Sequence, residues 1–149
     1  MSTVAPARPA EPGPEDYRLQ DQIGFILRRA HQRHVAIFAS HIGDLTPPQF
    51  AALAKLRDVG ETSQNQLGVL IAMDAATVKG VIDRLKARGF VELAKHEDDK
   101  RRLMVSLTEA GRTALDRLVP FASRITDETL APLTPRERVK LRALLAKIA

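Results

Sequence analysis

The stretch that decides the fold covers residues 61–108 and reads ETSQNQLGVLIAMDAATVKGVIDRLKARGFVELAKHEDDKRRLMVSLT. It holds two helix start signals in close succession. Ser63 precedes a short apolar run that ends near Met73, and Asp74 precedes a longer one that ends at Gly89. Serine and aspartate are favoured N-cap residues because their oxygens accept bonds from free backbone N–H groups. The sequence therefore predicts two helices joined by a tight turn.

Two short strands are expected directly after these helices. Val91–Lys95 and Leu103–Leu107 are short apolar segments, and the second alternates in polarity. The charged loop 96–102 connects them. A short helix, a tight turn, a longer helix and a hairpin with a charged tip follow one another in a winged helix-turn-helix, in which the hairpin is called the wing. This order is typical of DNA-binding domains.

The longer helix has two distinct faces. Val78, Val81, Ile82 and Leu85 form an apolar stripe that would pack on the shorter helix. Small, hydroxyl and cationic residues on the other face suit a recognition helix, which inserts its first turns into the major groove. The residues predicted to contact DNA from the two helices are Ser63, Gln64, Asn65, Ala76, Thr77, Lys79, Gly80 and Arg84.

Gly80 requires a reason of its own. Glycine inside a helix costs about 1 kcal/mol relative to alanine. Two explanations fit the sequence equally: close approach of the helix to DNA, or close packing against another element of the fold.

The loop 96–102 ends in Lys100, Arg101 and Arg102, which we expect to reach DNA phosphates or the minor groove. The alternative is an ordinary solvated hairpin tip. Asp98 or Asp99 is expected to hold Arg101 by a charge-assisted hydrogen bond that shapes the wing.

The flanking sequence predicts four more helices. One runs from Tyr17 to about Ile42 by apolar periodicity, and a second begins at the capping box of Thr46 and Gln49 and ends at Gly60. Thr108 begins a fifth helix that Pro120 is expected to kink, and Thr134 begins a sixth. The sixth helix carries an apolar stripe of Leu141, Leu144, Leu145 and Ile148.

The fold class is thus mainly α with a small β-hairpin wing. Residues 1–16 contain four prolines and are predicted to be a disordered tail, so that residues 17–149 form one domain. No apolar stretch approaches the roughly 20 residues of a membrane span, and no secretion signal precedes the domain, so we expect a cytoplasmic protein. The net charge of +5 suits a polyanionic partner but also any basic soluble protein.

Several classes of function are disfavoured. The chain has no cysteine, which excludes disulfides, thiol catalysis and cysteine-ligated zinc. No phosphate-binding, dinucleotide-binding, metalloprotease or serine-hydrolase motif is present, so we expect neither an enzyme nor a cofactor. His31, His34 and His41 make a poor metal site, because His34 and His41 lie two helical turns apart. A winged helix that binds only protein stays open as the alternative.

Three segments resemble the multiple antibiotic resistance regulator (MarR) family: TVKGVIDRLKARGFVE at 77–92, DKRR at 99–102 and SLTEAG at 106–111. The resemblance extends over most of residues 17–148. It implies an obligate homodimer, with a DNA-binding lobe at 61–107 and dimerisation helices at 17–45 and 108–149. Asp99 and Arg101 match the paired aspartate and arginine of the family's wing. Lys100 departs from the arginine common between them, which keeps the charge but loses the planar fork.

The resemblance also implies a repressor that binds a pseudo-palindromic operator in double-stranded DNA and is released by a small aromatic or phenolic acid or its coenzyme A thioester. Arg28, His34, Phe38 and Phe50 would supply a cation, a polar donor and aromatic walls for such an effector. The alternative for these four residues is a dimer-interface helix with surface arginines and core phenylalanines.

Overall fold

The computed structural model describes residues 9–149 and divides into two units at the bond between Arg33 and His34. Residues 1–8, which belong to the predicted disordered tail, lie outside the described residues. Pro14–Asp16 of that tail form a 3-10 turn (η1), and Leu19–Asp21 form a second one (η2). The division between the units falls inside the first long helix rather than at the predicted boundary of the tail.

The first long helix, α1, spans Ile23–His41, so the prediction that it begins at Tyr17 is wrong. Tyr17, Arg18 and Gln22 adopt extended backbone conformations, which interrupt helical hydrogen bonding six residues into the predicted helix. Tyr17 and Leu19 are 61% and 53% exposed. Their apolar periodicity therefore has no partner surface in this unit to stabilise a helix.

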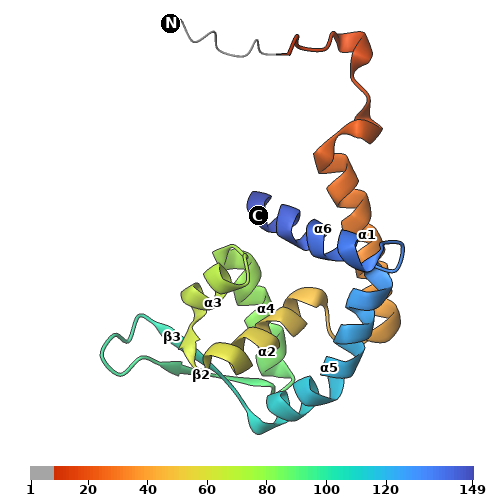
Figure 1. The fold of residues 1–149 in the computed structure, drawn as a ribbon. Coiled ribbons are helices and arrows are strands. Elements are labelled where there is room, and N and C mark those ends of the chain that lie inside the picture. The colour runs from red at the N-terminus through yellow and green to blue at the C-terminus, as the bar shows by residue number, and fades with distance from the viewer. Residues whose placement is uncertain (1–8) are drawn as a thin grey trace, which may run out of the picture. The chain divides into compact units, whose positions relative to one another are not determined.

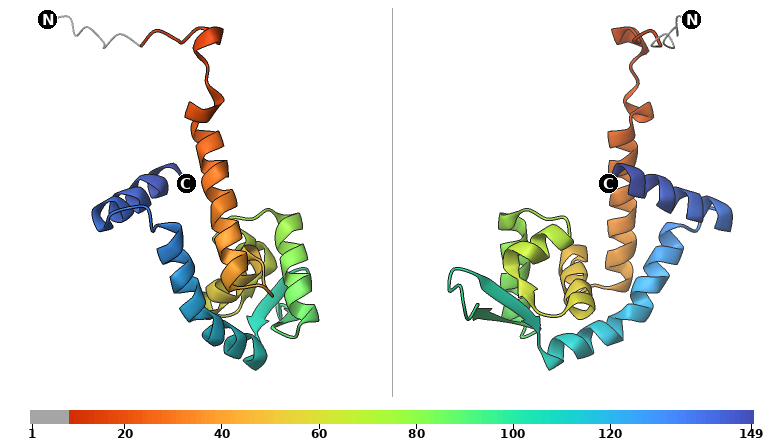
Figure 2. Two further views of the ribbon diagram at one scale, coloured as in Figure 1. Left: turned by 90° about the vertical axis from the view of Figure 1, so that its right-hand side faces the viewer. Right: turned by 60° about the vertical axis from the view of Figure 1, so that its left-hand side comes forward.

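The second unit, residues 34–149, contains the predicted winged helix-turn-helix (Figure 1). After α1 its elements are α2 (Pro47–Val59), β1 (Thr62–Ser63), α3 (Gln64–Leu70), α4 (Ala75–Ala87), β2 (Val91–Lys95), β3 (Leu103–Leu107), α5 (Glu109–Thr129) and α6 (Pro135–Ile148). Both strands of the wing have their predicted bounds. Figure 2 shows α5 bending along its length, in agreement with the kink expected at Pro120.

The sheet has three antiparallel strands in the order β1-β3-β2, one more than predicted. β1 is only two residues long and pairs Thr62 with Val105 and Ser63 with Met104. A segment this short carries no alternation of polarity, so only its pairing with β3 reveals it. It joins the start of α3 to the wing.

Local caps begin the helices as predicted. The capping boxes at Thr46 and Thr134 are complete, and the side chains of Asp74 and Thr108 accept the expected backbone bonds. At Ser63 the hydroxyl accepts from the Gln66 N–H at 3.1 Å, but within residues 9–149 the Gln66 side chain makes no return bond. The start of α3 therefore has the predicted N-cap bond but not the reciprocal bond of a full capping box.

One core holds the second unit together. Its most deeply buried side chains come from α2, α3, α4, α5, β3 and the segment after α1, and they include Ile42, Leu53, Leu67, Ile82, Leu85, Leu115 and Val105. Helix α6 contributes no buried residue to this core. Among the described helices, none combines the length and hydropathy required to cross a membrane.

Candidate nucleic-acid interface

Helix α4 presents the two faces that the sequence predicts. Val78, Val81, Ile82 and Leu85 are all buried in the core. Asp74 begins the helix, since its Oδ1 accepts a hydrogen bond from the Thr77 N–H at 2.7 Å. That bond to the carboxylate lowers the pKa of Asp74. On the opposite face Ala76, Thr77, Lys79 and Arg84 are exposed.

The structure bears on one of the two explanations for Gly80. A methyl group added at this glycine would meet no heavy atom within 4 Å in the described chain. Close packing against another element is therefore excluded within this protomer. Close approach of the helix to DNA stays the prediction for this glycine.

Lys79 does not stand alone on this face. Its Nζ lies 2.8 Å from Oδ2 of Asp83, one helical turn away, and the two side chains are 66% and 52% exposed. Asp83 was absent from the predicted site. An exposed pair of this kind contributes only ~0–1 kcal/mol. Lys79 can therefore exchange its carboxylate partner for a DNA phosphate at little cost.

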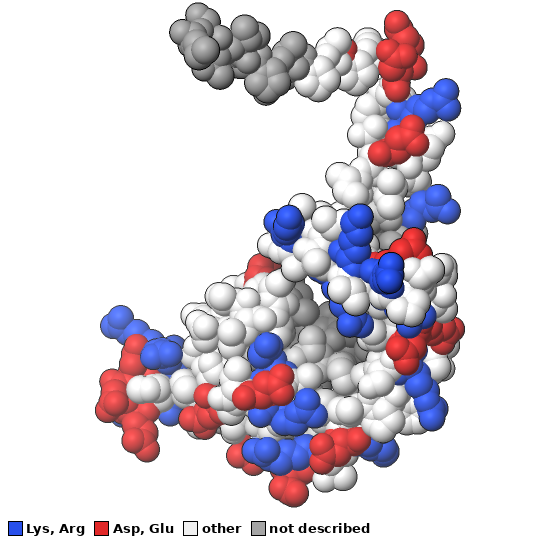
Figure 3. All heavy atoms as spheres, viewed as in Figure 1, with Lys and Arg blue, Asp and Glu red and all other residues white. Residues whose placement is uncertain are grey.

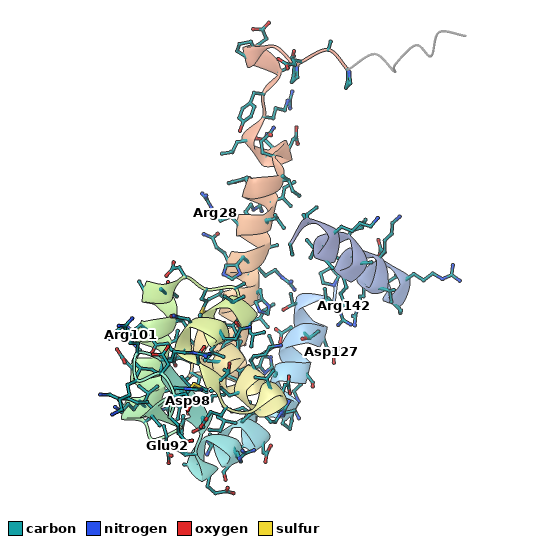
Figure 4. All side chains as sticks on the ribbon, turned by 90° about the vertical axis from the view of Figure 1, so that its left-hand side faces the viewer. Arg28, Glu92, Asp98, Arg101, Asp127 and Arg142 are labelled. Atoms are coloured by element: carbon teal, nitrogen blue, oxygen red, sulfur yellow. The ribbon has the colours of Figure 1, made fainter. Side chains whose placement is uncertain are left out.

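The N-terminus of α3 and the exit of the wing meet at one hollow of about 420 Å³. Its lining includes Gln64 and Asn65 from α3 and Arg101 and Arg102 from the wing. Figure 4 labels the side chain of Arg101, which comes from the wing. Two predicted DNA-contacting segments, nearly forty residues apart in sequence, thus form one polar groove.

Ser63 is the one buried residue among those predicted to contact DNA from the two helices. It is only 7% exposed, and its hydroxyl caps α3. A serine at an N-cap position commits its oxygen to the helix backbone. Ser63 still lines the groove beside Gln64 and Asn65, and its contact with DNA stays a prediction.

The wing is shaped by Asp99. Oδ1 of Asp99 accepts a hydrogen bond from the backbone N–H of Arg101 at 3.0 Å, and its carbonyl accepts from the Arg102 N–H at 3.0 Å. The structure therefore contains the expected carboxylate bond to Arg101, with the backbone N–H as its donor. Among residues 9–149 the Arg101 guanidinium has no ion pair with Asp98 or Asp99. The guanidinium is therefore available to a ligand.

Lys100, Arg101 and Arg102 are exposed, as predicted. Figure 3 shows basic and acidic side chains side by side at the tip of the wing. The cations follow the carboxylates in sequence and lie toward the end of the loop that rejoins β3. Two of these cations, Arg101 and Arg102, line the groove beside α3.

Sequence reasoning also missed Arg88, the C-cap of α4. Its guanidinium donates to the carbonyl oxygen of Asp44, lies 3.3 Å from the Asp44 carboxylate, and stacks 4.7 Å from the ring centre of Phe90. The contact ties the end of α4 to the loop before α2. It joins residues 44 positions apart, so no local pattern could reveal it.

Within the second unit, the predicted effector residues Phe38 and Phe50 lie in contact, whereas His34 lies at a different hollow. Arg28 is exposed on the part of α1 that belongs to the first unit. His34 lies 2.9 Å from the Thr129 hydroxyl and lines a hollow of about 180 Å³ between α5 and α6. Phe38 is buried, makes an edge contact with Phe50 at 6.2 Å, and lines a different hollow of about 410 Å³. The two phenylalanines therefore belong to the core.

No group of three or more His, Asp or Glu side chains in the described part of the chain is arranged to hold a metal ion.

The hollow beside Phe38 is lined mainly by apolar groups from the end of α1 and the start of α2, with Thr46 and Gln49 as its polar neighbours. Asp44, the partner of Arg88, lies on its rim.

Comparisons with known proteins agree with this architecture. The model of the MarR family matches residues 45–103. The transcriptional repressor NicR of Pseudomonas putida is 42% identical over 134 residues, which cover 89% of this chain and 85% of NicR. A probable transcriptional regulator from Pseudomonas aeruginosa is 53% identical, with a TM-score of 0.86 over 89% of this chain and 100% of that one.

A third relative is BpsR of Bordetella bronchiseptica, whose DNA binding is regulated by 6-hydroxynicotinic acid. It is 45% identical, with a TM-score of 0.86 over 91% of this chain and 97% of that one. The recognition helix, the wing and nearly full-length similarity lead to one conclusion: the chain belongs to the MarR family of winged helix-turn-helix transcriptional regulators.

Proposed function

We propose that this protein is a transcriptional repressor that binds a pseudo-palindromic operator as a homodimer and releases it when a small aromatic acid binds. The observation that carries the DNA-binding part is the cationic surface made by the exposed face of α4 and the groove between α3 and the wing. Arg84, Arg101 and Arg102 are exposed there, and Gly80 leaves room for a partner to approach. In a symmetric dimer the two α4 helices would contact major grooves about 34 Å apart.

The repressor part of the proposal is supported by NicR, which carries that function at 42% identity. The effector part is supported by BpsR. From it we propose 6-hydroxynicotinic acid, or a closely related hydroxylated aromatic acid, as the effector of this chain. The apolar hollow beside Phe38 is the best candidate for the aromatic ring.

The DNA contacts can be tested with Arg84→Ala and Arg101→Ala on DNA from upstream of the protein's own gene. Each variant is expected to bind this DNA roughly tenfold more weakly or worse, and to lower the slope of log K against log salt by about one. The dimer should stay intact, since neither side chain packs in an apolar stripe. Arg136→Ala, which removes an exposed cation from α6, is the matched control. Wild-type affinity of both variants at physiological salt would contradict the assignment.

The effector can be tested on the same DNA by fluorescence anisotropy. Adding 6-hydroxynicotinic acid is expected to weaken operator binding by roughly 5- to 150-fold at saturation, the usual range of allosteric coupling. By reciprocity, operator DNA should weaken binding of the acid by the same factor. Benzoic acid, which lacks the ring nitrogen and hydroxyl group, serves as the comparison compound. If DNA binding depends on salt but no such acid affects it, the proposed repressor function stands and the proposed effector is wrong.

The protein-interaction module remains the alternative function. It predicts no salt-steep association with duplex DNA of any sequence. Absence of such binding in the same titration would favour it.

A further inference from the structure

The wing turn is held together by the side chain of His96, a residue outside the predicted DNA-contacting site. The turn runs from His96 to Arg102 and is closed by a backbone bond from the His96 N–H to the Arg102 carbonyl at 3.0 Å. Inside it, Nδ1 of His96 accepts hydrogen bonds from the backbone N–H groups of Asp98 at 3.1 Å and Asp99 at 3.2 Å. One imidazole nitrogen thus holds two consecutive backbone donors.

These bonds extend to the cations of the wing. The Asp99 residue that His96 holds accepts in turn from the N–H groups of Arg101 and Arg102. His96 therefore fixes Asp99, and Asp99 fixes the two arginines that line the groove against α3. Removing the Nδ1 acceptor leaves two N–H groups without their partner and loosens the segment that carries the arginines.

We propose that His96 is the positioning residue of the DNA-contacting wing, and that its use of a titratable acceptor makes operator binding pH-dependent. The proposal rests on the DNA-binding function proposed above. An imidazole nitrogen accepts a hydrogen bond only when it carries no proton, so this turn requires neutral His96 with its hydrogen on Nε2. Protonation turns Nδ1 into a donor that faces two other donors.

Charged groups surround the imidazole on several sides. Glu61, Lys95, Glu97 and Asp98 line the same hollow of about 340 Å³ as His96, together with Met104 of β3. Protonation would add positive charge beside three carboxylates and, in the complex, near DNA phosphates. That charge alone would strengthen DNA binding, whereas loss of the turn would weaken it. The two consequences have opposite signs and can be separated.

A pair of substitutions separates them. Asparagine at position 96 keeps an acceptor oxygen that can bond backbone N–H groups two and three residues ahead, but it does not titrate. Alanine at position 96 removes the acceptor altogether. At about pH 8 we expect His96→Asn to bind operator DNA within roughly threefold of wild type, and His96→Ala to bind roughly tenfold more weakly with a salt slope lower by about one.

The decisive measurement is the pH profile. Between about pH 8 and pH 5, the range in which histidine side chains titrate, the affinity of wild type is expected to fall roughly tenfold relative to His96→Asn, which shares every other group. Wild-type affinity of His96→Ala at pH 8 overturns the positioning role. A ratio of wild type to His96→Asn that stays constant or rises on acidification overturns the pH dependence.

A measurement without DNA keeps this proposal separate from the proposed function. The ¹⁵N chemical shifts of His96 in the free protein report which ring nitrogen carries the hydrogen. We expect the Nε2–H tautomer at pH 8, and the Nδ1–H tautomer would overturn the turn geometry itself. If that geometry holds while the wild type shows no salt-steep DNA binding, the DNA-binding function fails and the role of His96 in it fails too, but the organised turn stands.

Discussion

The Gly111→Ala protein is expected to be destabilised by about 3 kcal/mol or more, the upper part of the range for overpacked sites. Gly111 is buried in the first turn of α5. A methyl group there would lie 2.1 Å from the carbonyl oxygen of Phe90 and 3.2 Å from a Leu107 methyl carbon. The first contact is with backbone, which cannot rotate away as a side chain can.

The surrounding hydrogen bonds prevent relief of this clash. The Phe90 carbonyl accepts from the Thr108 N–H at 3.1 Å, and the Thr108 hydroxyl donates to the Gly89 carbonyl at 2.6 Å. The start of α5 is thereby fixed to the turn between α4 and β2. Relieving the clash would break this joint, on which the orientation of the recognition helix and the wing depends.

Gly80→Ala is the matched control, since it makes the same chemical change in a helix with open space around the glycine. It is expected to stabilise the protein by about 0.5–1 kcal/mol through helix propensity. Urea unfolding followed by circular dichroism measures both variants. A Gly111→Ala midpoint equal to that of wild type would contradict the packing described here. If close approach to DNA explains Gly80, the stabilised Gly80→Ala protein should also bind operator DNA more weakly.

The two glycines show what sequence can and cannot establish. Both stand in helical patterns, and Gly80 is conspicuous in the sequence because it interrupts a strong helix. Gly111 lies near a helix start, where glycine is common and gives no sign of its packing. Which glycine lies against another backbone depends on how α5 meets the turn after α4. That is a property of the tertiary structure.

The same distinction runs through the rest of the site. Helix caps and wing strands depend on neighbouring residues, so the local sequence predicts them. The caps at Thr46, Asp74 and Thr108 are examples. The predicted start of α1 at Tyr17 is wrong because apolar periodicity alone does not provide a surface on which the helix can pack. Contacts between distant segments, such as Arg88 with Asp44, had no sequence signal at all.

His96 is an intermediate case. A signal was present, since it stands two and three residues before the N–H groups that it binds. That is the spacing at which asparagine or aspartate side chains organise turns. In the wing turn only the carboxylates of Asp98 and Asp99 were expected to accept such bonds, although the imidazole of His96 can accept them too.

Helix α6 supplies the second large effect, because its apolar face is largely uncovered within the described chain. Leu144, Leu145 and Ile148 are 49%, 37% and 66% exposed, and the helix buries none of its residues. In the first unit Ile23, Ile26 and Leu27 are exposed as well. Apolar patches of this kind mark association surfaces. We infer that a second copy of the chain covers them, as the proposed homodimer requires.

The double variant Leu144→Glu with Ile148→Glu is therefore expected to be a folded monomer. Two carboxylates at the dimer interface would be buried without partners, which costs several kcal/mol in association. The substitutions remove no buried contact from the protomer core. Any change in the urea midpoint relative to wild type should therefore reflect only the lost association. Analytical ultracentrifugation should show wild type at twice the 16.4 kDa mass of one chain and the variant at that mass.

Operator affinity should fall with the dimer by roughly 10²- to 10⁴-fold, because two linked recognition helices bind with an effective concentration that a monomer lacks. The control is Ala146→Glu, which adds one carboxylate on the opposite face of α6. It should stay dimeric and bind DNA as wild type does. A monomeric double variant that still binds operator DNA at wild-type affinity would show that a single recognition helix and wing suffice, and the paired geometry over a pseudo-palindrome would then be wrong.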